Sequence, residues 1–89
     1  MSRPNLTIER KPIDFTPREY NKRAIGKRIS QRMRELDYTQ MQVAEAIDAS
    51  ESNMYSWCSG RSTPSARYLM ELARLLETTA EWLVFGDEH

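Results

Sequence analysis

The sequence predicts an all-α fold, with five helices around a single core. Apolar residues recur at intervals of three and four along most of the chain, which is the period of an amphipathic helix rather than of a strand. Residues that cap helices or form turns divide this pattern into five segments. A chain of 89 residues supports one domain with one modest core. We expect helices over about 17–36, 40–47, 51–58, 66–76 and 80–85.

The first fifteen residues, 1–15, are expected to form an N-terminal arm, followed by a single domain over residues 16–89. The arm carries two prolines, scattered charge and few residues large enough for a core, so our first expectation is plain disorder. Leu6 and Ile8 alternate with polar neighbours. A short strand formed on a binding partner is therefore the alternative.

The first helix is expected to begin at Pro17. Thr16 and Glu19 have the spacing of a capping box, and proline is favoured at the first helical position. Phe15 and Tyr20 stand where a hydrophobic staple belongs. The buried stripe of this helix continues as Ile25, Ile29, Met33 and Leu36.

The second and third helices are short and are separated by a tight turn. Thr39 can cap the second helix and Ser50 can cap the third. The third helix hides only Met54 and Trp57, which lie three residues apart on one face. Its other residues are small or polar, so it offers a ridge suited to a groove, and the DNA major groove is wide enough to admit a helix. The apolar residues of the second helix are Met41, Val43, Ala44 and Ile47.

The fourth and fifth helices complete the core. Ser65 can cap the fourth, whose core side is Leu69, Leu72, Ala73 and Leu76. The cap of the fifth helix stays open between Thr78, which has capping-box spacing with Glu81, and Thr79. Gly86 is a natural stop. The core candidates to which we assign no chemistry are Val43, Ile47, Met54, Trp57, Leu72 and Trp82.

The composition argues against several classes of function. No apolar run is long enough to span a membrane and the N-terminus shows no signal-peptide pattern, so we expect a cytoplasmic protein. One cysteine cannot form an internal disulfide, and no Cys/His cluster indicates a metal, so we expect no cofactor and no small-molecule substrate. An enzyme is a weak interpretation because paired catalytic groups and an internal histidine are lacking. Cys58 has no basic partner and is expected to pack in the core.

The net charge of zero conceals a strong asymmetry. Residues 1–36 carry ten Lys or Arg against four Asp or Glu, while residues 37–89 carry three against nine. The basic half is either a solvated helix face or an electrostatic footprint for phosphates, and the acidic half should face away from nucleic acid. The basic residues on or near the first helix are Arg18, Lys22, Arg23, Lys27, Arg28, Arg32 and Arg34.

Together these elements resemble the helix-turn-helix domain of the lambda-repressor-like (XRE) family, especially the repressors of temperate phages and prophages. The resemblance spans about residues 25–87. Family members often carry glycine at the end of the first helix and at the turn between the second and third. Asp37 and Asp48 occupy these places, and we expect both in the left-handed conformation that Asp tolerates. The matching elements are Thr39-Gln40, Val43-Ala44, Ile47, Ser50, Trp57, Gly60, Pro64, Leu69 through Leu72-Ala73, Leu76, Trp82-Leu83 and Gly86-Asp87.

A second departure from the family concerns an internal ion pair. Many members pair an Arg late in the first helix with a Glu just after the recognition-helix hydrophobe. The matching residues here are Met33 and Cys58, so both partners have become apolar and no lone charge is buried. We therefore predict that Met33 contacts Cys58.

The resemblance also implies which residues meet DNA. Those expected at base edges are Glu51, Ser52, Tyr55 and Ser56. Those expected on the sugar–phosphate backbone are Gln40, Ser50, Asn53, Arg61, Ser62 and Arg67. Glu51 could instead serve the helix dipole, Tyr55 could pack over the next loop, and Arg67 could simply be solvated. The basic residues of the arm could also reach a groove.

The function implied is a sequence-specific transcriptional regulator, most simply a phage or prophage repressor that binds double-stranded operator DNA as a homodimer and is associated with the nucleoid. Half-sites about one helical turn apart would let both recognition helices enter successive major grooves. In the family the region of the fifth helix often forms the dimer contact, and Trp82, Val84 and Phe85 are expected there. The alternative is an antitoxin that binds a toxin and represses its own promoter. An antirepressor is a further candidate protein partner.

Overall fold

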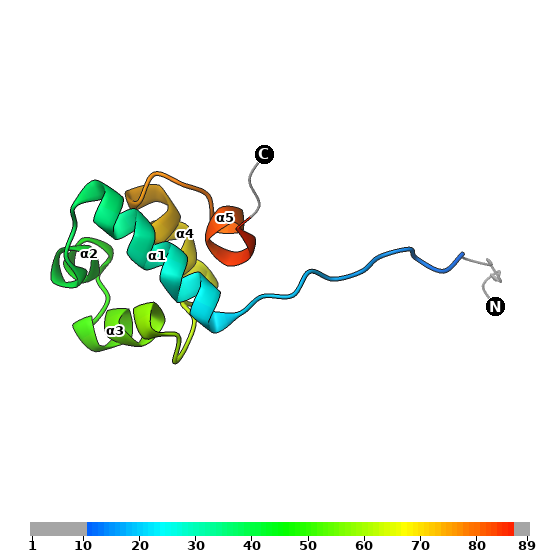
Figure 1. Ribbon diagram of the computed structural model, residues 1–89, viewed down its shortest axis with the longest axis horizontal. Coiled ribbons are helices and arrows are strands. Elements are labelled where there is room, and N and C mark those ends of the chain that lie inside the picture. The colour runs from blue at the N-terminus through cyan, green and yellow to red at the C-terminus, as the bar shows by residue number, and fades with distance from the viewer. Residues whose placement is uncertain (1–10, 87–89) are drawn as a thin grey trace, which may run out of the picture.

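A computed structural model describes residues 11–86, and the secondary structure within them is entirely helical. The predicted all-α class and its five helices are confirmed. Figure 1 shows α1 running through the middle of the molecule, with α2 and α3 on one side of it and α5 on the other. α1 packs on α3 and α5, and α2 packs on α3 and α4. The helices are α1 (Lys22–Leu36), α2 (Gln40–Ile47), α3 (Glu51–Ser59), α4 (Ala66–Leu75) and α5 (Ala80–Phe85).

The predicted start of the first helix is wrong by five residues. Residues 11–21 are non-helical and exposed, and they lead away from the helices (Figure 1). The cap is Asn21, whose side chain accepts hydrogen bonds from the backbone N–H of Arg23 and Ala24 at 2.9 and 3.1 Å. A helix begun at Pro17 would project its first turn beyond the core, where no apolar surface could stabilise it.

The expected hydrophobic staple is absent for the same reason. Phe15 and Tyr20 are 72% and 61% exposed, so neither packs against a first helical turn. The extended stretch thus continues past the expected arm as far as Asn21. The strand proposed at Leu6 and Ile8 falls outside the described residues.

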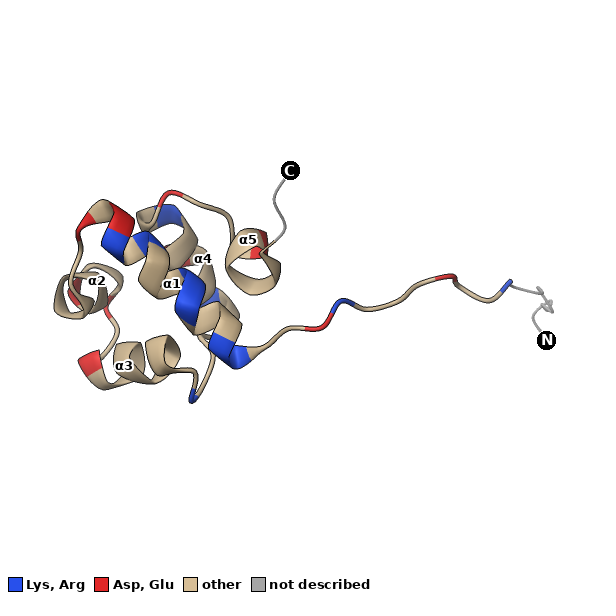
Figure 2. Cartoon of the chain, in the orientation of Figure 1, with Lys and Arg blue, Asp and Glu red and all other residues tan. Residues whose placement is uncertain are grey.

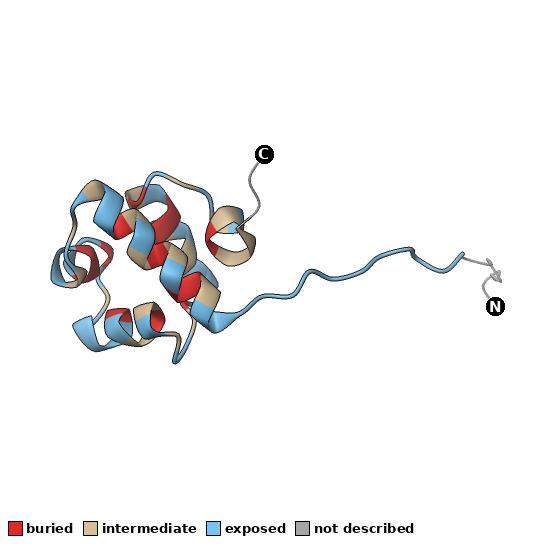
Figure 3. Cartoon of the chain, viewed as in Figure 1, coloured by how far each residue is buried: buried red, intermediate tan, exposed pale blue. Residues whose placement is uncertain are grey.

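The core is built almost entirely from the predicted stripes (Figure 3). Four predicted members differ, and two of them, Leu36 and Leu69, are half-buried at the edge of the core. Met41 is exposed because it lies about 160° around α2 from the face that buries Val43. Trp82 is only half-buried, and Leu83 takes the interior place on α5. The buried apolar residues are Ile25, Ile29, Met33, Val43, Ala44, Ile47, Met54, Trp57, Leu72, Ala73, Leu76 and Leu83.

The helix ends follow the predicted capping chemistry closely. Asp37 and Asp48 both adopt the left-handed conformation, with φ of 63° and 62°. Thr79 is the cap of α5, because its hydroxyl accepts a hydrogen bond from the backbone N–H of Trp82 at 3.0 Å. Ser65 precedes α4 but makes no side-chain capping bond. α3 extends one residue further than predicted and α4 ends one residue earlier, which is the usual latitude of helix boundaries.

Two arginines of α1 close the C-terminal ends of other helices. Arg28 donates to the backbone carbonyls of Leu83 and Val84, both at 3.0 Å. Arg32 donates from Nε to the carbonyl of Leu76 at 2.9 Å, just after α4. A cation at a helix C-terminus satisfies unpaired carbonyls and opposes the negative end of the helix dipole. These contacts tie α4 and α5 to α1.

Gly26 allows a close approach of α1 to α3. A Cβ atom at this residue would lie 2.4 Å from the carbonyl oxygen of Trp57 and 2.7 Å from that of Cys58. Both obstacles are backbone atoms near the end of α3, so no side-chain rotation could relieve the overlap. The backbones of α1 and α3 therefore touch directly at this point.

We predict that Gly26→Ala destabilises the protein, although alanine is the better helix former by about 1 kcal/mol at an exposed site. Overpacking against fixed backbone should lower the free energy of unfolding by about 2–3 kcal/mol. Urea denaturation followed by circular dichroism measures this change. Lys27→Ala, at the exposed neighbouring residue, is the control and should stay within about 0.5 kcal/mol of the parent. An unchanged or raised midpoint for Gly26→Ala would show that α1 and α3 are not in backbone contact.

Candidate nucleic-acid interface

The start of α2 is fixed by a reciprocal capping box. The Thr39 hydroxyl accepts a hydrogen bond from the N–H of Gln42 at 3.1 Å, and the Gln42 side chain accepts one from the N–H of Thr39 at 2.8 Å. The first-turn N–H groups of Gln40 and Met41 have no intrahelical acceptor, and they point out of the helix end. This arrangement suits an anion such as a phosphate.

The turn between α2 and α3 is held by the predicted Ser50 cap and by contacts of Tyr68 that the sequence did not reveal. The Tyr68 hydroxyl donates to the carbonyl of Asp48 at 3.1 Å, and its ring lies 5.2 Å from that of Trp57. The Ser50 hydroxyl accepts from the N–H of Asn53 at 3.0 Å. Tyr68 thus connects α4 to both sides of the turn and fixes the angle between α2 and α3. Because Tyr68 is followed by apolar residues in α4, nothing in the sequence indicated that it contacts this turn.

The exposed side of α3 carries all four predicted base-reading residues. Glu51, Ser52 and Tyr55 are exposed and Ser56 is half-buried, while Met54 and Trp57 anchor the opposite side in the core. Glu51 stands at the first turn of α3 and is its only charged residue, as Figure 2 shows. This exposed side of α3, the α3 ridge, therefore carries mainly short, uncharged side chains, with one carboxylate at its start.

The loop after α3 is anchored to the end of that helix. The carbonyl of Ser56 accepts hydrogen bonds from the backbone N–H of Arg61 at 2.9 Å and of Ser62 at 3.4 Å. The guanidinium of Arg61 lies 6.0 Å from the centre of the Tyr55 ring, at the edge of cation–π range. Arg61 and Ser62 thus continue the surface of the α3 ridge rather than lying apart from it.

Lys22, at the start of α1, lies in the same region. It lines one shallow hollow together with Asn21, Arg61, Ser62 and Thr63. The sequence assigned Lys22 only to a general basic face and did not connect it with the loop. Such proximity depends on how α1 crosses α3, which is set at Gly26 and cannot be deduced from spacing along the chain.

The basic charge of the first 36 residues divides between two sides of the molecule. Arg28 and Arg32 are engaged with the carbonyls that follow α5 and α4, and Arg18 pairs with Glu81 at 2.9 Å. The expected footprint on α1 is consequently reduced, since these charges serve the internal structure. Arg23 packs close to Gly60 through its side-chain methylene, on the α3 side.

Arg67 contacts Tyr68 of α4 rather than the loop that contains Arg61. Its guanidinium lies 5.3 Å from the centre of the Tyr68 ring, over the residue that holds the α2–α3 turn. Asn53 is exposed and Ser50 caps α3, so the predicted backbone-contact residues Gln40, Ser50, Asn53, Arg61 and Ser62 all belong to the α2–α3–loop surface.

The expected dimer residues are partly covered by the chain itself. Trp82, Val84 and Phe85 are all half-buried. The Arg18 guanidinium lies 4.0 Å from the centre of the Phe85 ring, next to its ion pair with Glu81.

Met33 and Cys58 belong to the same core region. Met33 is buried and Cys58 is half-buried against the core, as the sequence led us to expect. The side chain of Ser30, one turn before Met33 on α1, is the hydrogen-bond partner of the Cys58 thiol. Burial raises the pKa of the Cys58 thiol above its ordinary range, and the Ser30 contact offsets part of that rise. Direct contact between Met33 and Cys58 remains a prediction.

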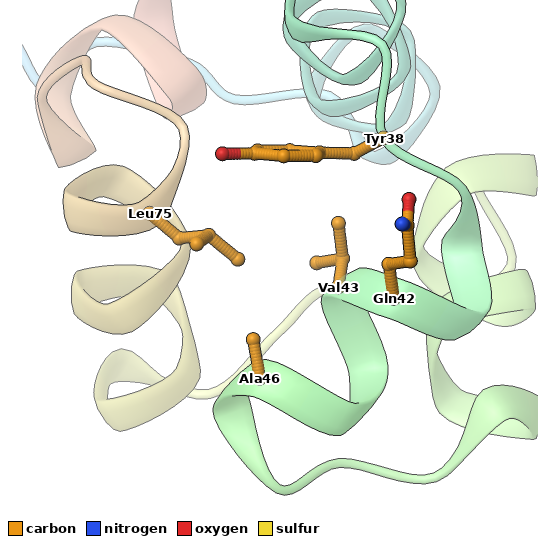
Figure 4. A pocket seen from close by; sticks show the side chains of 5 residues that line it. All are labelled: Tyr38, Gln42, Val43, Ala46 and Leu75. Atoms are coloured by element: carbon orange, nitrogen blue, oxygen red, sulfur yellow. The ribbon is translucent and has the colours of Figure 1, made fainter.

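The described residues also form a small pocket away from α3. A pocket of about 120 Å³ between α2 and α4 is lined by Tyr38, Gln42, Val43, Ala46 and Leu75 (Figure 4). Its lining contains no carboxylate, thiol or imidazole. Residues 11–86 hold no group of three or more His, Cys, Asp or Glu side chains suited to a metal ion. No helix among them is both long and apolar enough to cross a membrane.

The chain is similar to known helix-turn-helix proteins. Residues 24–83 match the model of a helix-turn-helix domain family. The transcriptional regulator DicA of Escherichia coli is 36% identical over 72% of this chain and 47% of its own length. A regulator for the conjugative element SXT of Vibrio cholerae is 31% identical over 73% of this chain and 30% of its own. The chain therefore spans less than half of these curated relatives.

Solved structures give the same fold. The N-terminal DNA-binding domain of SinR from Bacillus subtilis superposes with a TM-score of 0.66 at 27% identity, over 74% of this chain and 94% of that domain. The P22 c2 repressor bound to a synthetic operator superposes with a TM-score of 0.68 at 24% identity, over 71% of this chain and 96% of that one. The lambda-repressor-like fold expected from the sequence is confirmed.

We predict that the thiol of Cys58 makes the protein less stable at high pH. Because its pKa is raised in the folded state, its contribution to stability is complete below the unfolded pKa of about 8.5 and is lost as the pH rises through the higher folded value. Urea midpoints at pH 7 and pH 10 should therefore fall further for the parent than for Cys58→Ala. Equal decreases in both proteins would exclude this effect.

Proposed function

We propose that this chain, which belongs to the helix-turn-helix domain family, is a DNA-binding transcriptional regulator of the XRE type. It acts as a repressor that binds a two-fold operator as a homodimer through the major groove. One observation carries the proposal. The exposed side of α3 continues into the Arg61 loop, and the largely exposed first turn of α2 belongs to the helix that packs on α3. The ridge is shaped for a groove, and the two flanking parts present donors to phosphates on either side.

The relatives support a phage, prophage or related mobile element as the setting. Curated relatives at 31% identity regulate conjugative elements, and the P22 c2 repressor shares the fold. Repressors of this kind act by occupying a promoter, which needs affinity and sequence preference but no catalytic group. The family is one of DNA-binding regulators rather than enzymes.

The base-reading part of the proposal assigns Glu51, Ser52, Tyr55 and Ser56 to base edges. Glu51 can accept a hydrogen bond from the amino group of cytosine, and serine hydroxyls can serve several bases. Tyr55 can contact a thymine methyl group. Because the ridge lacks an arginine that could grip guanine in two places, part of the discrimination should come from DNA shape.

The backbone part of the proposal assigns Gln40, Ser50, Asn53, Arg61 and Ser62 to the phosphates, with Lys22 added from the structure. Gln40 stands beside the outward N–H groups of α2, and Lys22 shares its hollow with Arg61. Arg67 is assigned to the same role, through the outer side of Tyr68. Contacts of this kind fix the register of the protein on DNA without reading sequence.

The dimer part of the proposal assigns the contact to α5 and its surroundings, with Trp82, Val84 and Phe85 at its centre. All three remain half-exposed in the single chain. Two recognition helices related by a two-fold axis would read half-sites about 34 Å apart, one turn of DNA.

Regulation by a protein partner is the second candidate. The structural neighbour SinR is known in a complex with a second protein, SinI. That structure matches this chain at 28% identity, over 66% of this chain and 58% of that one. An antirepressor, or a toxin neutralised by this chain as an antitoxin, would fit such a role.

We predict that Arg61→Ala weakens binding to all duplexes by a similar factor, because its contact is with phosphate. The slope of log affinity against log salt concentration should fall by about 1. Fluorescence anisotropy with operator and scrambled DNA across a salt series measures both quantities. Arg74→Ala is the matched control, since Arg74 is paired with Glu71 on α4 and should leave the slope unchanged. A full salt slope in Arg61→Ala would remove Arg61 from the interface.

We predict that Glu51→Gln alters sequence preference rather than overall affinity. Replacing an acceptor-only group by an amide should relax discrimination at one base pair by about 1–3 kcal/mol. Selection of bound sites from a random DNA pool, run in parallel on the parent and the variant, gives the comparison. Glu71→Gln, on α4, serves as the control. Identical selected sites for parent and Glu51→Gln would assign Glu51 to the helix dipole instead.

A further inference from the structure

An apolar groove lies beside the root of the N-terminal arm. Its walls come from the start of α1, the loop before α4, the first turns of α4 and the end of α5, and they include Ile25, Pro64, Ala66, Leu69 and Val84. Its volume is about 260 Å³. An apolar cavity of about 150 Å³ is enough to admit benzene, so this groove has room for an aromatic side chain.

The arm carries two large apolar side chains that contact little of their own chain. Ile13 is 87% exposed and Phe15 is 72% exposed. Being two residues apart, they lie on the same side of an extended segment. Pro12 and Pro17 flank the pair, and proline restricts the residue before it to extended conformations. Residues 12–17 therefore form an extended segment with one apolar side.

The direction of the arm favours a second molecule over its own groove. Arg18 is held at the outer side of α5 by Glu81 at 2.9 Å and by the Phe85 ring at 4.0 Å. Upstream of Arg18 the chain leads away from the helices (Figure 1). The three residue steps from Arg18 to Phe15 span up to about 10 Å when extended, which is enough to reach a neighbour docked directly against α5.

We propose that the arm is exchanged between the two copies of a homodimer, with Phe15 entering the apolar groove of the partner copy and Ile13 packing beside it. The inference rests on the homodimer of the proposed function. Two-fold symmetry makes the exchange reciprocal, so each dimer gains two such contacts. Val84 lines the groove and also belongs to the expected α5 contact, so the exchanged arm extends that interface rather than forming a separate one.

The first test is photo-crosslinking in mixed dimers. Unlabelled chain carrying p-benzoyl-phenylalanine in place of Phe15 is mixed with ¹⁵N-labelled parent chain, irradiated and mapped by mass spectrometry. We expect adducts to labelled peptides that contain residues 63–69. The same photoprobe in place of Asp14, on the other side of the extended segment, is the control and should give far fewer. Adducts confined to unlabelled peptides of the same chain would show that the arm folds back, and would overturn the exchange.

The second test separates this inference from the proposed function. Phe15→Ser should weaken the dimer at least tenfold in sedimentation equilibrium, because two aromatic side chains per dimer lose their burial. Met41→Ser, which removes another exposed apolar side chain, from α2, should leave the dissociation constant of the dimer unchanged. A parent that dimerises normally, with an unaltered constant in Phe15→Ser, would overturn the exchange alone. A parent that stays monomeric on operator DNA would overturn both the homodimer and the exchange.

Discussion

The backbone contact between α1 and α3 at Gly26 is the constraint on which the rest of the structure depends. With no side chain between them, the carbonyls of Trp57 and Cys58 lie directly against α1. A contact between two backbones leaves little room for adjustment, unlike one between flexible side chains. The C-terminal half of α3 is therefore held by α1, and its N-terminal half is held by Tyr68 through the preceding turn. Both ends of the α3 ridge are thus held by other helices of the chain.

Helix α1 also stabilises the ends of α4 and α5 through its arginines. Arg28 and Arg32 leave the side opposite α3 and satisfy carbonyls at the ends of α5 and α4. A basic helix beside a helix-turn-helix invites assignment to phosphate binding, yet these charges stabilise the domain from within. The cations left near the reading surface are few, and the ridge itself carries a carboxylate. Since non-specific affinity is mainly electrostatic, this chain should depend more on shape and geometry than a strongly basic repressor does.

Sequence pattern was sufficient wherever local chemistry decides the structure. Capping residues predicted the starts of α2 and α3, and the resemblance to the family predicted the left-handed conformations of Asp37 and Asp48. It failed at Pro17, where a well-formed capping box lacks a core to pack against, and capping alone cannot stabilise a helical turn. Sequence pattern also did not predict that Lys22 lies beside Arg61, or that Tyr68 contacts the turn between α2 and α3. Those proximities depend on how helices cross, and crossing is decided by backbone contacts such as that at Gly26.

Because one helix joins the two working surfaces, their relative placement is a property of the fold. α1 contacts α3 through Gly26 and α5 through Arg28, so the reading ridge and the expected dimer contact are fixed to the same rigid element. A dimer formed at α5, as proposed, would then set the separation of its two ridges without any flexible linker between them. The spacing of operator half-sites would follow from this geometry, and the arm, which lies outside the rigid element, could strengthen the pairing without altering that spacing. Affinity between subunits and register on DNA would thus be adjustable by separate parts of one short chain.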